Sequence, residues 1–320
     1  MVRGIGIAVC AGVAFAVLSS TGCQGSARES SRTTPAIRVA SDGRDYNPLL
    51  DALNGPLQAY FPSRIRTMQN DLPNNVRLVE RGETDLAIVP VNVAYLAYNY
   101  GWADVHHPYT KLRGIAALYS IPLYLIARRS SGIRNWTEIR GKRLAVGTTD
   151  STTQVTVKMA LEALGVAFED IDAKWINGDA AVRALRDGEV DAVFHRGNDP
   201  PSTLPKLLQI PGVDAVPISA REAERIRARH PFLHPIVTTP YASGNHASIP
   251  TIGVDSLVVC RDDLPEKLAY FVTRSVFELL LGSPSLTRGF QRVDLRRIQA
   301  TPIPLHLGAA RYFRERELFQ

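Results

Sequence analysis

Apolar and polar positions along the chain follow two periods, and together they predict an α/β protein. Short, mainly apolar segments of the strand type cover residues 37–40, 85–89 and 191–194. In residues 157–164 the apolar positions instead recur every three or four residues, and Gly165 follows as a helix stop. Strands that alternate with helices in this way are typical of an α/β domain.

The same patterns predict further elements. Strands are predicted at residues 64–68 and 142–147, and helices at residues 48–60, 133–141 and 265–282. Two β-rich runs, residues 112–131 and 251–261, are long enough to cross between two lobes. The first of these runs is predicted to be two strands joined at Pro122, because proline cannot donate to a sheet.

A helix, a glycine and a buried strand follow one another twice along the chain. When Gly82 is aligned with Gly188, four more positions are identical, so that Val76, Arg77, Glu83 and Asp85 match Val182, Arg183, Glu189 and Asp191. One interpretation is a repeated unit that builds two similar lobes, which face a ligand cleft at the carboxyl ends of their strands. The other is that any helix–glycine–strand joint carries such residues, and the sequence leaves both open.

The first 22 residues have the features of a secretory signal. Arg3 precedes an uncharged stretch that ends at Gly22, and Cys23 follows. The segment SSTGC is similar to a bacterial lipobox, in which the cysteine after the cleavage point carries lipid. We therefore expect an exported, periplasmic or cell-envelope lipoprotein anchored to the membrane through Cys23, with ordinary secretion and cleavage nearby as the alternative. Residues 23–35 are rich in Ser, Thr, Gly and Arg and are predicted to be a flexible tether.

Composition is that of a soluble globular protein, with 45% hydrophobic and 21% charged residues. Without the first 22 residues, 36 Lys and Arg face 31 Asp and Glu, because only Arg3 is lost. The densest charged run, residues 221–230, mixes both signs on a predicted helix, and no nucleic-acid motif accompanies it. No nucleic-acid partner is therefore expected. Cys260 lies in an apolar run and is expected to be a buried strand residue rather than a nucleophile.

Hydroxyl groups gather where a predicted strand ends and a helix begins. Thr149, Ser151 and Thr152 follow the strand at residues 142–147. The N–H groups and the dipole at a helix start favour an anion, and the hydroxyl groups add hydrogen-bond donors. The alternative is plain capping of the helix by Asp150 or Ser151.

His195 follows the predicted strand at residues 191–194, at a position where ligands bind in α/β proteins. A lone histidine is more often structural or solvent-facing than chemical. No second His, Cys or Glu stands near it at the spacing of metal ligands, and the adjacent His106 and His107 do not suit one metal ion. Neither a metal nor a cofactor is expected.

Four motifs are more specific than these patterns. They are GETDLAIVPVNVAYLAYNYG at residues 82–101, LRGIAALYSIPLYLIARRSSGI at 112–133, IRGKRLAVG at 139–147 and PIPLHLGAARYFRE at 302–315. The last is the most specific, because no general rule brings together His306, Gly308, Ala309, Tyr312 and Glu315. Over about residues 37–318 the chain resembles the TAXI group of solute receptors, which serve tripartite ATP-independent periplasmic (TRAP) transporters.

This resemblance implies the type II periplasmic binding protein fold, an α/β fold with two lobes, a ligand cleft and hinge strands between the lobes. Lobe 1 would comprise residues 36–120 and 256–320, and lobe 2 residues 121–255. The resemblance also implies capture of a small organic solute, a carboxylate or an amino acid, and its delivery to a TRAP-type membrane permease driven by an ion gradient.

The chain departs from the family where ligand is expected. Arg44 and Asp45 replace small residues in the loop after the first strand, although Tyr46 fits the family, and residues 69–75 replace a Thr-Gly-Gly-Ser loop. In the cleft, the Arg44 guanidinium would form a bidentate bond to a carboxylate. The alternative is a solvated arginine neutralised by Asp42 or Asp45.

A cleft between two lobes requires polar groups from both sides. The candidate ligand-binding residues are Arg44, Tyr46, Asn70, Asn92 and Tyr95 from lobe 1 and Thr149, Ser151, Thr152 and His195 from lobe 2, with Tyr119 and Tyr241 as candidate walls. The alternative for each tyrosine is a place in the core.

The sequence thus favours an extracytoplasmic receptor that closes over a small organic anion or amino acid without covalent chemistry. An enzyme is not expected, because the chain has no G-x-S-x-G, H-E-x-x-H or P-loop pattern. The alternative is a ligand-sensing or scaffold lipoprotein of the cell envelope that acts through a membrane signalling partner.

Overall fold

The computed structural model describes residues 36–41, 47–61, 64–69, 72–102, 106–197, 203–238, 248–282 and 295–316. Residues 34–320 form one compact unit, to which the following description applies. The predicted signal segment, Cys23, the tether, and the candidate residues Arg44, Tyr46, Asn70 and Tyr241 lie outside the described residues. Within the described residues, every helix is too short or too polar to cross a membrane.

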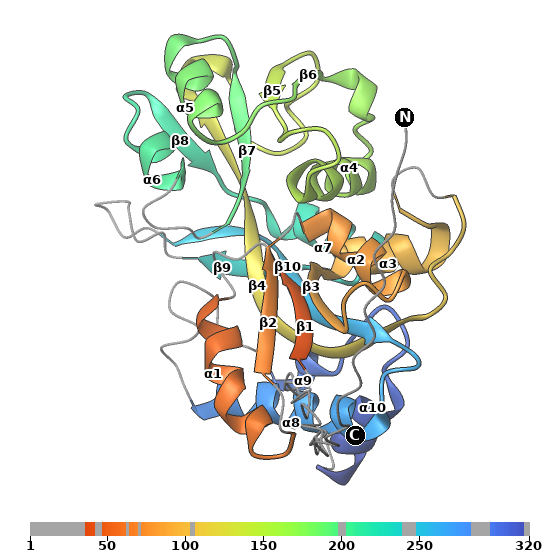
Figure 1. Ribbon diagram of the computed structural model, residues 1–320. Coiled ribbons are helices and arrows are strands. Elements are labelled where there is room, and N and C mark those ends of the chain that lie inside the picture. The colour runs from red at the N-terminus through yellow and green to blue at the C-terminus, as the bar shows by residue number, and fades with distance from the viewer. Residues whose placement is uncertain are drawn as a thin grey trace, which may run out of the picture. The chain divides into compact units, whose positions relative to one another are not determined.

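Strands and helices alternate along most of the chain, as the hydrophobic pattern predicts (Figure 1). The strands are β1 (Ala36–Ser41), β2 (Arg64–Gln69), β3 (Leu86–Pro90), β4 (Leu112–Arg128), β5 (Arg143–Ala145), β6 (Asp172–Lys174), β7 (Ala192–Arg196), β8 (Val213–Val216), β9 (Leu233–Thr238) and β10 (Ile249–Arg261). The helices are α1 (Asn47–Gln58), α2 (Leu72–Glu80), α3 (Val91–Tyr100), α4 (Thr152–Ala163), α5 (Gly178–Asp187), α6 (Thr203–Leu208), α7 (Ala220–Arg229), α8 (Glu266–Gly282), α9 (Leu295–Ile298) and α10 (Leu307–Glu315), with 3₁₀ turns at Arg129–Ser131 and Phe168–Asp170.

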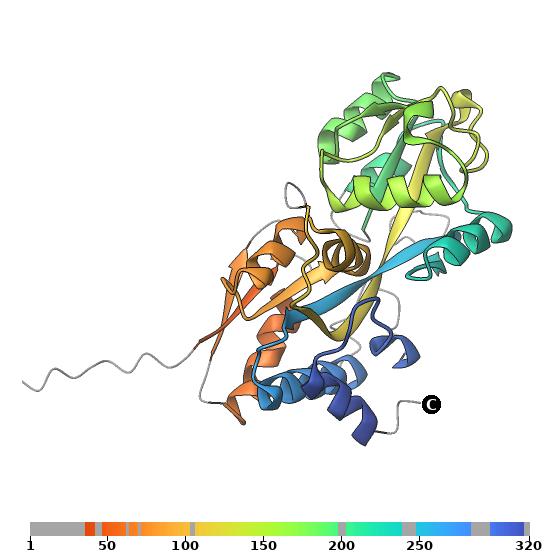
Figure 2. The same cartoon turned by 90° about the vertical axis from the view of Figure 1, so that its right-hand side faces the viewer.

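The strands form one sheet in the order β2-β1-β3-β10-β4-β7-β5-β6. Two parallel groups, β2-β1-β3 and β7-β5-β6, lie at its two ends. Between them β10 and β4 pair antiparallel with each other and with the neighbouring group, while β9 pairs with β10 and β8 with β4. Figures 1 and 2 show β4 and β10 running from one group of elements to the other.

The first crossing strand is continuous, which differs from the prediction of two strands joined at Pro122. β4 runs for 17 residues, and Pro122 lies opposite Gly253 of β10. Proline lacks only the N–H donor, and its carbonyl accepts a hydrogen bond from the Gly197 N–H at 3.0 Å, next to the end of β7 at Arg196. A single strand therefore connects the two groups of elements without a break.

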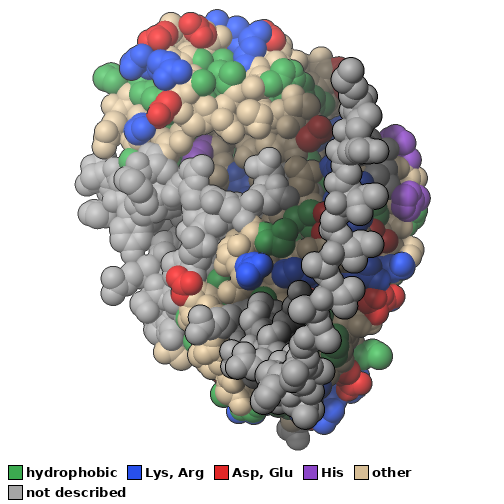
Figure 3. Space-filling model, in the orientation of Figure 1, with side chains coloured by type: hydrophobic (Ala, Val, Ile, Leu, Met, Phe, Trp, Pro, Cys, Tyr) green, Lys and Arg blue, Asp and Glu red, His purple; other side chains and the backbone are tan. Residues whose placement is uncertain are grey.

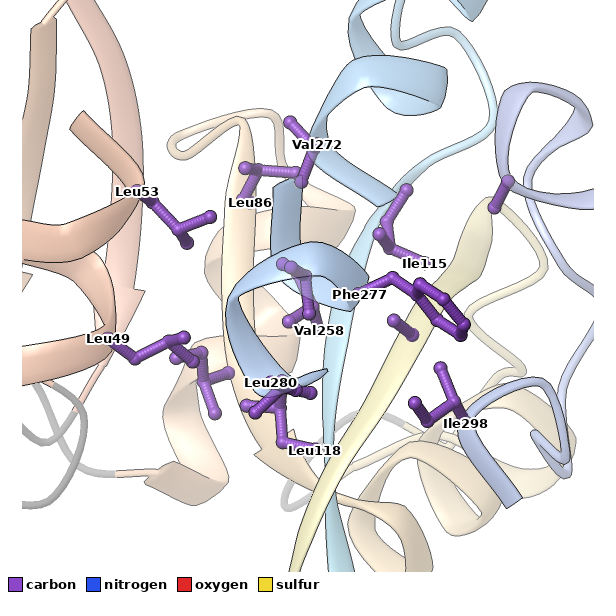
Figure 4. Packing of buried hydrophobic residues seen from close by; sticks show 14 of the residues in the cluster. Leu49, Leu53, Leu86, Ile115, Leu118, Val258, Val272, Phe277, Leu280 and Ile298 are labelled. Carbon is purple, nitrogen blue, oxygen red and sulfur yellow. The ribbon is translucent and has the colours of Figure 1, made fainter. Parts of the chain in front are cut away.

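The hydrophobic core is divided between the two groups. Two clusters of buried side chains draw on residues 37–121 and 257–313. Two others draw on residues 123–254. Figure 4 shows part of the first cluster, in which Leu53, Leu86 and Val272 pack together. This division supports the proposed lobes, residues 36–120 with 256–320 and residues 121–255, and from here they are called lobe 1 and lobe 2.

The repeated helix–glycine–strand unit builds the same contact in both lobes. In lobe 1 the Asp85 carboxylate accepts hydrogen bonds from the Arg38 N–H at 2.8 Å and from Nε and Nη2 of the same residue at 3.1 and 2.8 Å. In lobe 2 the Asp191 carboxylate accepts the equivalent three bonds from Arg143 at 2.9, 3.2 and 2.7 Å. Each aspartate precedes its strand and ties it to the neighbouring parallel strand.

The two glycines of the repeat also have the same surroundings. Gly82 has a φ of +69° and Gly188 a φ of +78°, the left-handed region that favours glycine. A Cβ at Gly82 would lie 2.9 Å from Arg261 Nη1 of β10, and one at Gly188 would lie 3.3 Å from Arg128 Nη1 of β4. The internal similarity in the sequence thus corresponds to a structural repeat.

Residues 133–141 form turns instead of the predicted helix. The Asn135 side chain accepts hydrogen bonds from the backbone N–H groups of Thr137 at 3.0 Å and Glu138 at 3.1 Å. Asparagine offers the backbone a local alternative to helical bonding, so the helix does not form.

The most specific sequence motif, residues 302–315, packs α10 against α8. His306 caps α10, because its Nδ1 accepts the Gly308 N–H at 3.1 Å. A Cβ at Gly308 would lie 2.2 Å from the Glu266 carbonyl oxygen, so only glycine allows this close approach of the two helices. Glu315 accepts a hydrogen bond from the Tyr270 hydroxyl at 2.6 Å. These residues therefore serve packing.

Candidate functional site

The start of α4 is the best-defined polar site among the candidates. β5 delivers the chain to Gly147, which has a φ of +92°. A Cβ there would lie 2.6 Å from Ser151 Oγ and 3.0 Å from Thr153 Cβ, so the loop folds tightly over the first turn of the helix. Thr148, Thr149 and Asp150 are exposed at its tip. The loop places backbone N–H groups and hydroxyl groups together at a solvent-facing helix end.

Ser151 caps this helix, which is one of the two alternatives that the sequence leaves open. Its Oγ accepts the Gln154 N–H at 3.2 Å, and its carbonyl accepts the Val155 N–H at 3.1 Å. The N–H groups of Thr152 and Thr153 come before those of Gln154 and Val155 in the chain. They have no partner within the helix, because no helical carbonyl lies four residues before them. Capping thus leaves two backbone donors that suit an anion.

Arg196, the last residue of β7, brings a positive charge to the same place. Its Nη1 lies 3.4 Å from Thr152 Oγ1, at the long end of hydrogen-bond range. Arg196 pairs with Leu123 in the sheet and therefore shares the face of Leu123 and Phe194, on which α4 packs. The guanidinium and the positive end of the α4 dipole converge at Thr152. Arg196 lies next to His195 but is not among the candidate residues predicted from the sequence.

His195 lies on the other face of β7. It pairs with Tyr124, whose side chain packs in a different core cluster from Leu123. Its Nε2 is buried without a hydrogen-bond partner, although the residue as a whole is only partly buried. Burial disfavours the charged imidazolium and lowers the pKa of His195 to about 4. The structure therefore does not bring His195 together with the hydroxyl groups at the start of α4, and a role in ligand binding stays a prediction.

Asn92 is fully buried between α3 and α4. Its Nδ2 donates to Thr156 Oγ1 at 3.1 Å, and its Oδ1 is buried without a partner. Asn92 belongs to lobe 1 and Thr156 to lobe 2. The side chain is therefore one turn of α4 away from Thr152 but does not itself face solvent.

The remaining described tyrosine candidates make packing contacts, and a ligand-binding role for either stays a prediction. Tyr119 is 1% exposed and belongs to the core of lobe 1, which is the alternative that the sequence leaves open. Tyr95 contacts Phe232 of lobe 2, with 5.0 Å between the ring centroids, and Tyr100, with 6.2 Å. Neither tyrosine joins the start of α4.

A second polar cluster lies where the crossing strands meet. Ser120 of β4 and Asp255 of β10 are register partners, and Ser120 Oγ donates to Asp255 Oδ1 at 2.5 Å. His234 of β9 places Nε2 3.0 Å from Ser120 Oγ. Arg297 of α9 places Nη2 3.0 Å from Asp255 Oδ2 and 2.6 Å from His234 Nδ1. We call these four residues the hinge cluster.

The hinge cluster holds Ser, His and Asp together, but the direction of its hydrogen bonds does not suit nucleophilic catalysis. A guanidinium only donates, so His234 Nδ1 accepts from Arg297 and the ring proton lies on Nε2, facing Ser120. An imidazole with its proton on that nitrogen cannot remove the Ser120 proton, which already points at Asp255. In a catalytic triad the histidine nitrogen that faces the serine is an acceptor and the aspartate orients the other.

Other chemistry is not assembled among the described residues. They contain no group of three or more His, Cys, Asp and Glu that could hold a metal ion. Cys260 is buried, and burial raises the pKa of its thiol well above the usual range, so a nucleophilic thiolate is disfavoured. A cavity of about 10 Å³ among Val39, Leu53 and Val276 is wholly apolar and holds at most one water molecule.

Several surface cations of lobe 2 are paired with carboxylates. Figure 3 shows positive and negative side chains interspersed over the upper group of elements. Arg129 pairs with Asp214 at 2.5 Å, and Lys206 with Asp179 at 2.6 Å. These side chains are neutralised by neighbours and do not form an anion site.

Three solved structures have the same fold as this chain, and one of them is a periplasmic binding protein. The periplasmic aliphatic sulphonate binding protein SsuA of Escherichia coli has a TM-score of 0.51 and 16% sequence identity over 80% of this chain and 77% of its own. A protein of Xanthomonas citri with bound ATP has a TM-score of 0.52 and 14% identity over 90% and 100%. A protein of Bordetella bronchiseptica RB50 has a TM-score of 0.51 and 14% identity over 88% and 98%. The expected α/β fold with two lobes is confirmed.

A sequence profile described as the NMT1-like family matches residues 73–316. This range begins in α2, includes both crossing strands and ends with α10, so it covers most of both lobes. The chain therefore belongs to the NMT1-like family.

Proposed function

We propose that this protein is an extracytoplasmic receptor that captures a small organic anion, a carboxylate or an amino acid, at the start of α4. The observation that carries the proposal is the convergence of Arg196 and the N-terminus of α4 at Thr152, with 3.4 Å between Nη1 and Oγ1. An oxyanion placed there would accept bonds from the guanidinium, the Thr152 hydroxyl and the N–H groups of the first turn.

The position of this site in the fold supports the proposal. It lies at the carboxyl ends of β5 and β7, which is where ligands bind in α/β sheets. The candidates Arg44, Tyr46 and Asn70 follow β1 and β2 in the sequence, and they stay predictions because they lie outside the described residues. Thr149 at the exposed loop tip and Thr152 at the helix start are the predicted residues that best suit the site.

The transport role rests on the sequence motifs. We propose delivery of the solute to a TRAP-type permease, because four motifs resemble the TAXI group of solute receptors. The protein would act outside the cytoplasm, exported by residues 1–22 and anchored through lipid on Cys23. The similar protein SsuA carries a periplasmic binding role in its name, which agrees with a non-enzymatic function.

Ligand-dependent stabilisation tests the binding role. Purified mature protein would be heated with carboxylates, sulfonates and amino acids in turn. A solute present at 100 times its Kd raises the free energy of unfolding by about 2.7 kcal/mol. We expect at least one organic anion to raise Tm. If no anion in the panel does so, the proposed class of solute is contradicted.

Uptake measurements test the permease. Cells that contain the receptor and its partner permease would be loaded with a labelled form of the stabilising anion. A TRAP-type partner predicts uptake that continues when ATP is depleted and stops when the ion gradient is collapsed. Uptake with the reverse pattern would contradict this partner and leave the binding role intact.

A further inference from the structure

Three apolar side chains join the cores of the two lobes beside the candidate site. Leu96 of α3, Val155 of α4 and Phe232 before β9 each pack against a core cluster of lobe 1 and a core cluster of lobe 2. Figures 1 and 2 show α3 and α4 next to each other. We call this contact between α3, α4 and Phe232 the interlobe seam.

One polar bond lies inside the interlobe seam. Asn92 and Thr156 are both fully buried, and Asn92 Nδ2 donates to Thr156 Oγ1 at 3.1 Å. The Thr156 hydroxyl donates its own hydrogen bond to the Thr152 carbonyl oxygen at 2.6 Å. Its oxygen is therefore oriented to accept, and Asn92 supplies the donor.

This bond continues into the proposed anion site. The Thr152 carbonyl accepts from Thr156, and the Thr152 hydroxyl lies 3.4 Å from Arg196 Nη1. A chain of hydrogen bonds thus runs from Asn92 in lobe 1 through Thr156 and Thr152 to Arg196 in lobe 2. Its members come from α3, α4 and β7, three elements that are distant in the sequence.

We propose that Asn92 and Thr156 are positioning residues that couple the closure of the lobes to the anion site at Thr152 and Arg196. The bond between them exists only in the arrangement of lobes seen here, because a hinge rotation that separates α3 from α4 breaks it. Closure then holds the first turn of α4 in place for the solute, and by linkage a bound solute favours closure. The proposal rests on the proposed function for its biological meaning, but the bond acts without solute.

The magnitude follows from a single buried hydrogen bond between neutral groups. Loss of such a bond changes an equilibrium by about five-fold. The solute-free protein without this bond should therefore show a closed-to-open ratio lower by about that factor. Solute affinity is expected to fall by up to the same factor, because closure and binding are linked.

Replacement of one hydroxyl group by a methyl group removes the bond, together with the bond from Thr156 to the Thr152 carbonyl. Thr156→Val removes the acceptor for Asn92 and keeps the shape of the side chain, whereas Thr156→Ser keeps the hydroxyl. Thr273→Val is the matched control, since Thr273 is also fully buried in a helix and donates in the same way to the Ala269 carbonyl at 2.7 Å. Thr273 lies in α8, within lobe 1 and away from the interlobe seam.

Lobe closure would be measured by pulsed electron paramagnetic resonance on the full chain without solute. Nitroxide labels at Lys267→Cys of α8 and Arg183→Cys of α5 report one exposed position in each lobe. Cys10 and Cys23 would be changed to Ser, and Cys260 is buried and resists labelling. The distance distribution gives the closed-to-open ratio directly.

We expect Thr156→Val to lower the closed-to-open ratio about five-fold, Thr156→Ser to restore it, and Thr273→Val to leave it unchanged. An unchanged distribution in Thr156→Val overturns the proposal. An equal shift in Thr273→Val also overturns it, because the effect would then come from the local helix. This measurement uses no solute, so it can fail while anion binding at Arg196 stands, and it can succeed when no anion in the panel binds.

Discussion

Arg196 and His195 follow each other in the chain, and strand alternation sends their side chains to opposite faces of β7. The arginine reaches the start of α4, where its permanent charge adds to the helix dipole. The histidine has a buried Nε2 without a partner, and burial keeps the ring neutral. Neighbouring residues thus have different electrostatic roles, and only Arg196 suits an anion at neutral pH.

The neutral state of His195 predicts acid sensitivity. Its pKa is lowered to about 4 in the folded protein, so between pH 6.5 and 4 the unfolded chain binds more protons than the folded one. Above about pH 6.5 His195 therefore does not lower the free energy of unfolding. As pH falls toward 4, the free energy of unfolding decreases by roughly 1 to 3 kcal/mol. Urea unfolding at pH 7 and pH 4.5 should show this loss in the wild type and a smaller one in His195→Gln. The same loss in both proteins would contradict the assignment.

Residue type alone explains why the sequence selects His195 and not Arg196. Histidine is rare and invites a functional interpretation, whereas arginine is common on the surface. The deciding information is which face of β7 each side chain occupies, and that depends on pairing with Leu123 and Tyr124, more than 70 residues earlier. The start of α4 could be predicted, because a strand followed by Thr and Ser residues is a local pattern.

At the scale of elements, the same helix–glycine–strand unit occurs in both lobes. A helix ends at a glycine, an aspartate follows, and its carboxylate ties the next strand to an arginine of the neighbouring parallel strand. The arginine of a crossing strand, Arg261 or Arg128, lies against the glycine. Each lobe is thus fixed to the strand that leads into or out of the other lobe.

The repeat predicts that Asp85→Asn and Asp191→Asn destabilise the protein by similar amounts. Each change weakens a set of charge-assisted bonds to Arg38 or Arg143 and should cost about 1 to 3 kcal/mol. The control is Asp187→Asn, because the exposed Asp187 pairs with its exposed neighbour Arg186 at 3.0 Å and its replacement should change stability little. Urea unfolding at pH 7 measures all three. A large loss in one lobe and none in the other would contradict the equivalence of the two units.

Elements were predictable where the pattern is local, and less so where distant residues decide. The glycine stops, the strands after them and the amphipathic helices follow from spacing. The prediction of a break at Pro122 was wrong, because β4 pairs with β10 on one side and with β7 on the other and so continues as one strand. The helix at residues 133–141 was wrong because the Asn135 side chain takes over the backbone N–H groups.

At the scale of the whole molecule, two groups of side chains connect the lobes. The hinge cluster lies at the crossing strands β4 and β10, and the interlobe seam lies beside the proposed anion site. Neither was predictable from the sequence, because Ser120 and Asp255 are 135 residues apart and Asn92 and Thr156 are 64 apart. Only the fold brings these side chains together.

The ion pair in the hinge cluster predicts how the free energies of unfolding of two single variants and their double variant compare. The Asp255 side chain is 8% exposed, and Arg297 is its guanidinium partner. Arg297→Met leaves a buried carboxylate without that partner and should cost about 3 kcal/mol. Adding Asp255→Asn removes the uncompensated charge, so the double variant should recover part of the loss. Urea unfolding of the two single variants and the double variant tests this. Losses that simply add in the double variant would contradict the ion pair.

Calorimetric titration tests the central claim most directly. The full chain would be titrated with the anion that gives the largest thermal shift, in the wild type, in Arg196→Met and in the control Arg183→Met, which changes an exposed arginine of α5 outside the site. Loss of a charge-assisted bond predicts a Kd weaker by at least about ten-fold in Arg196→Met and an unchanged Kd in Arg183→Met. An unchanged Kd in Arg196→Met would show that the solute does not bind at the start of α4.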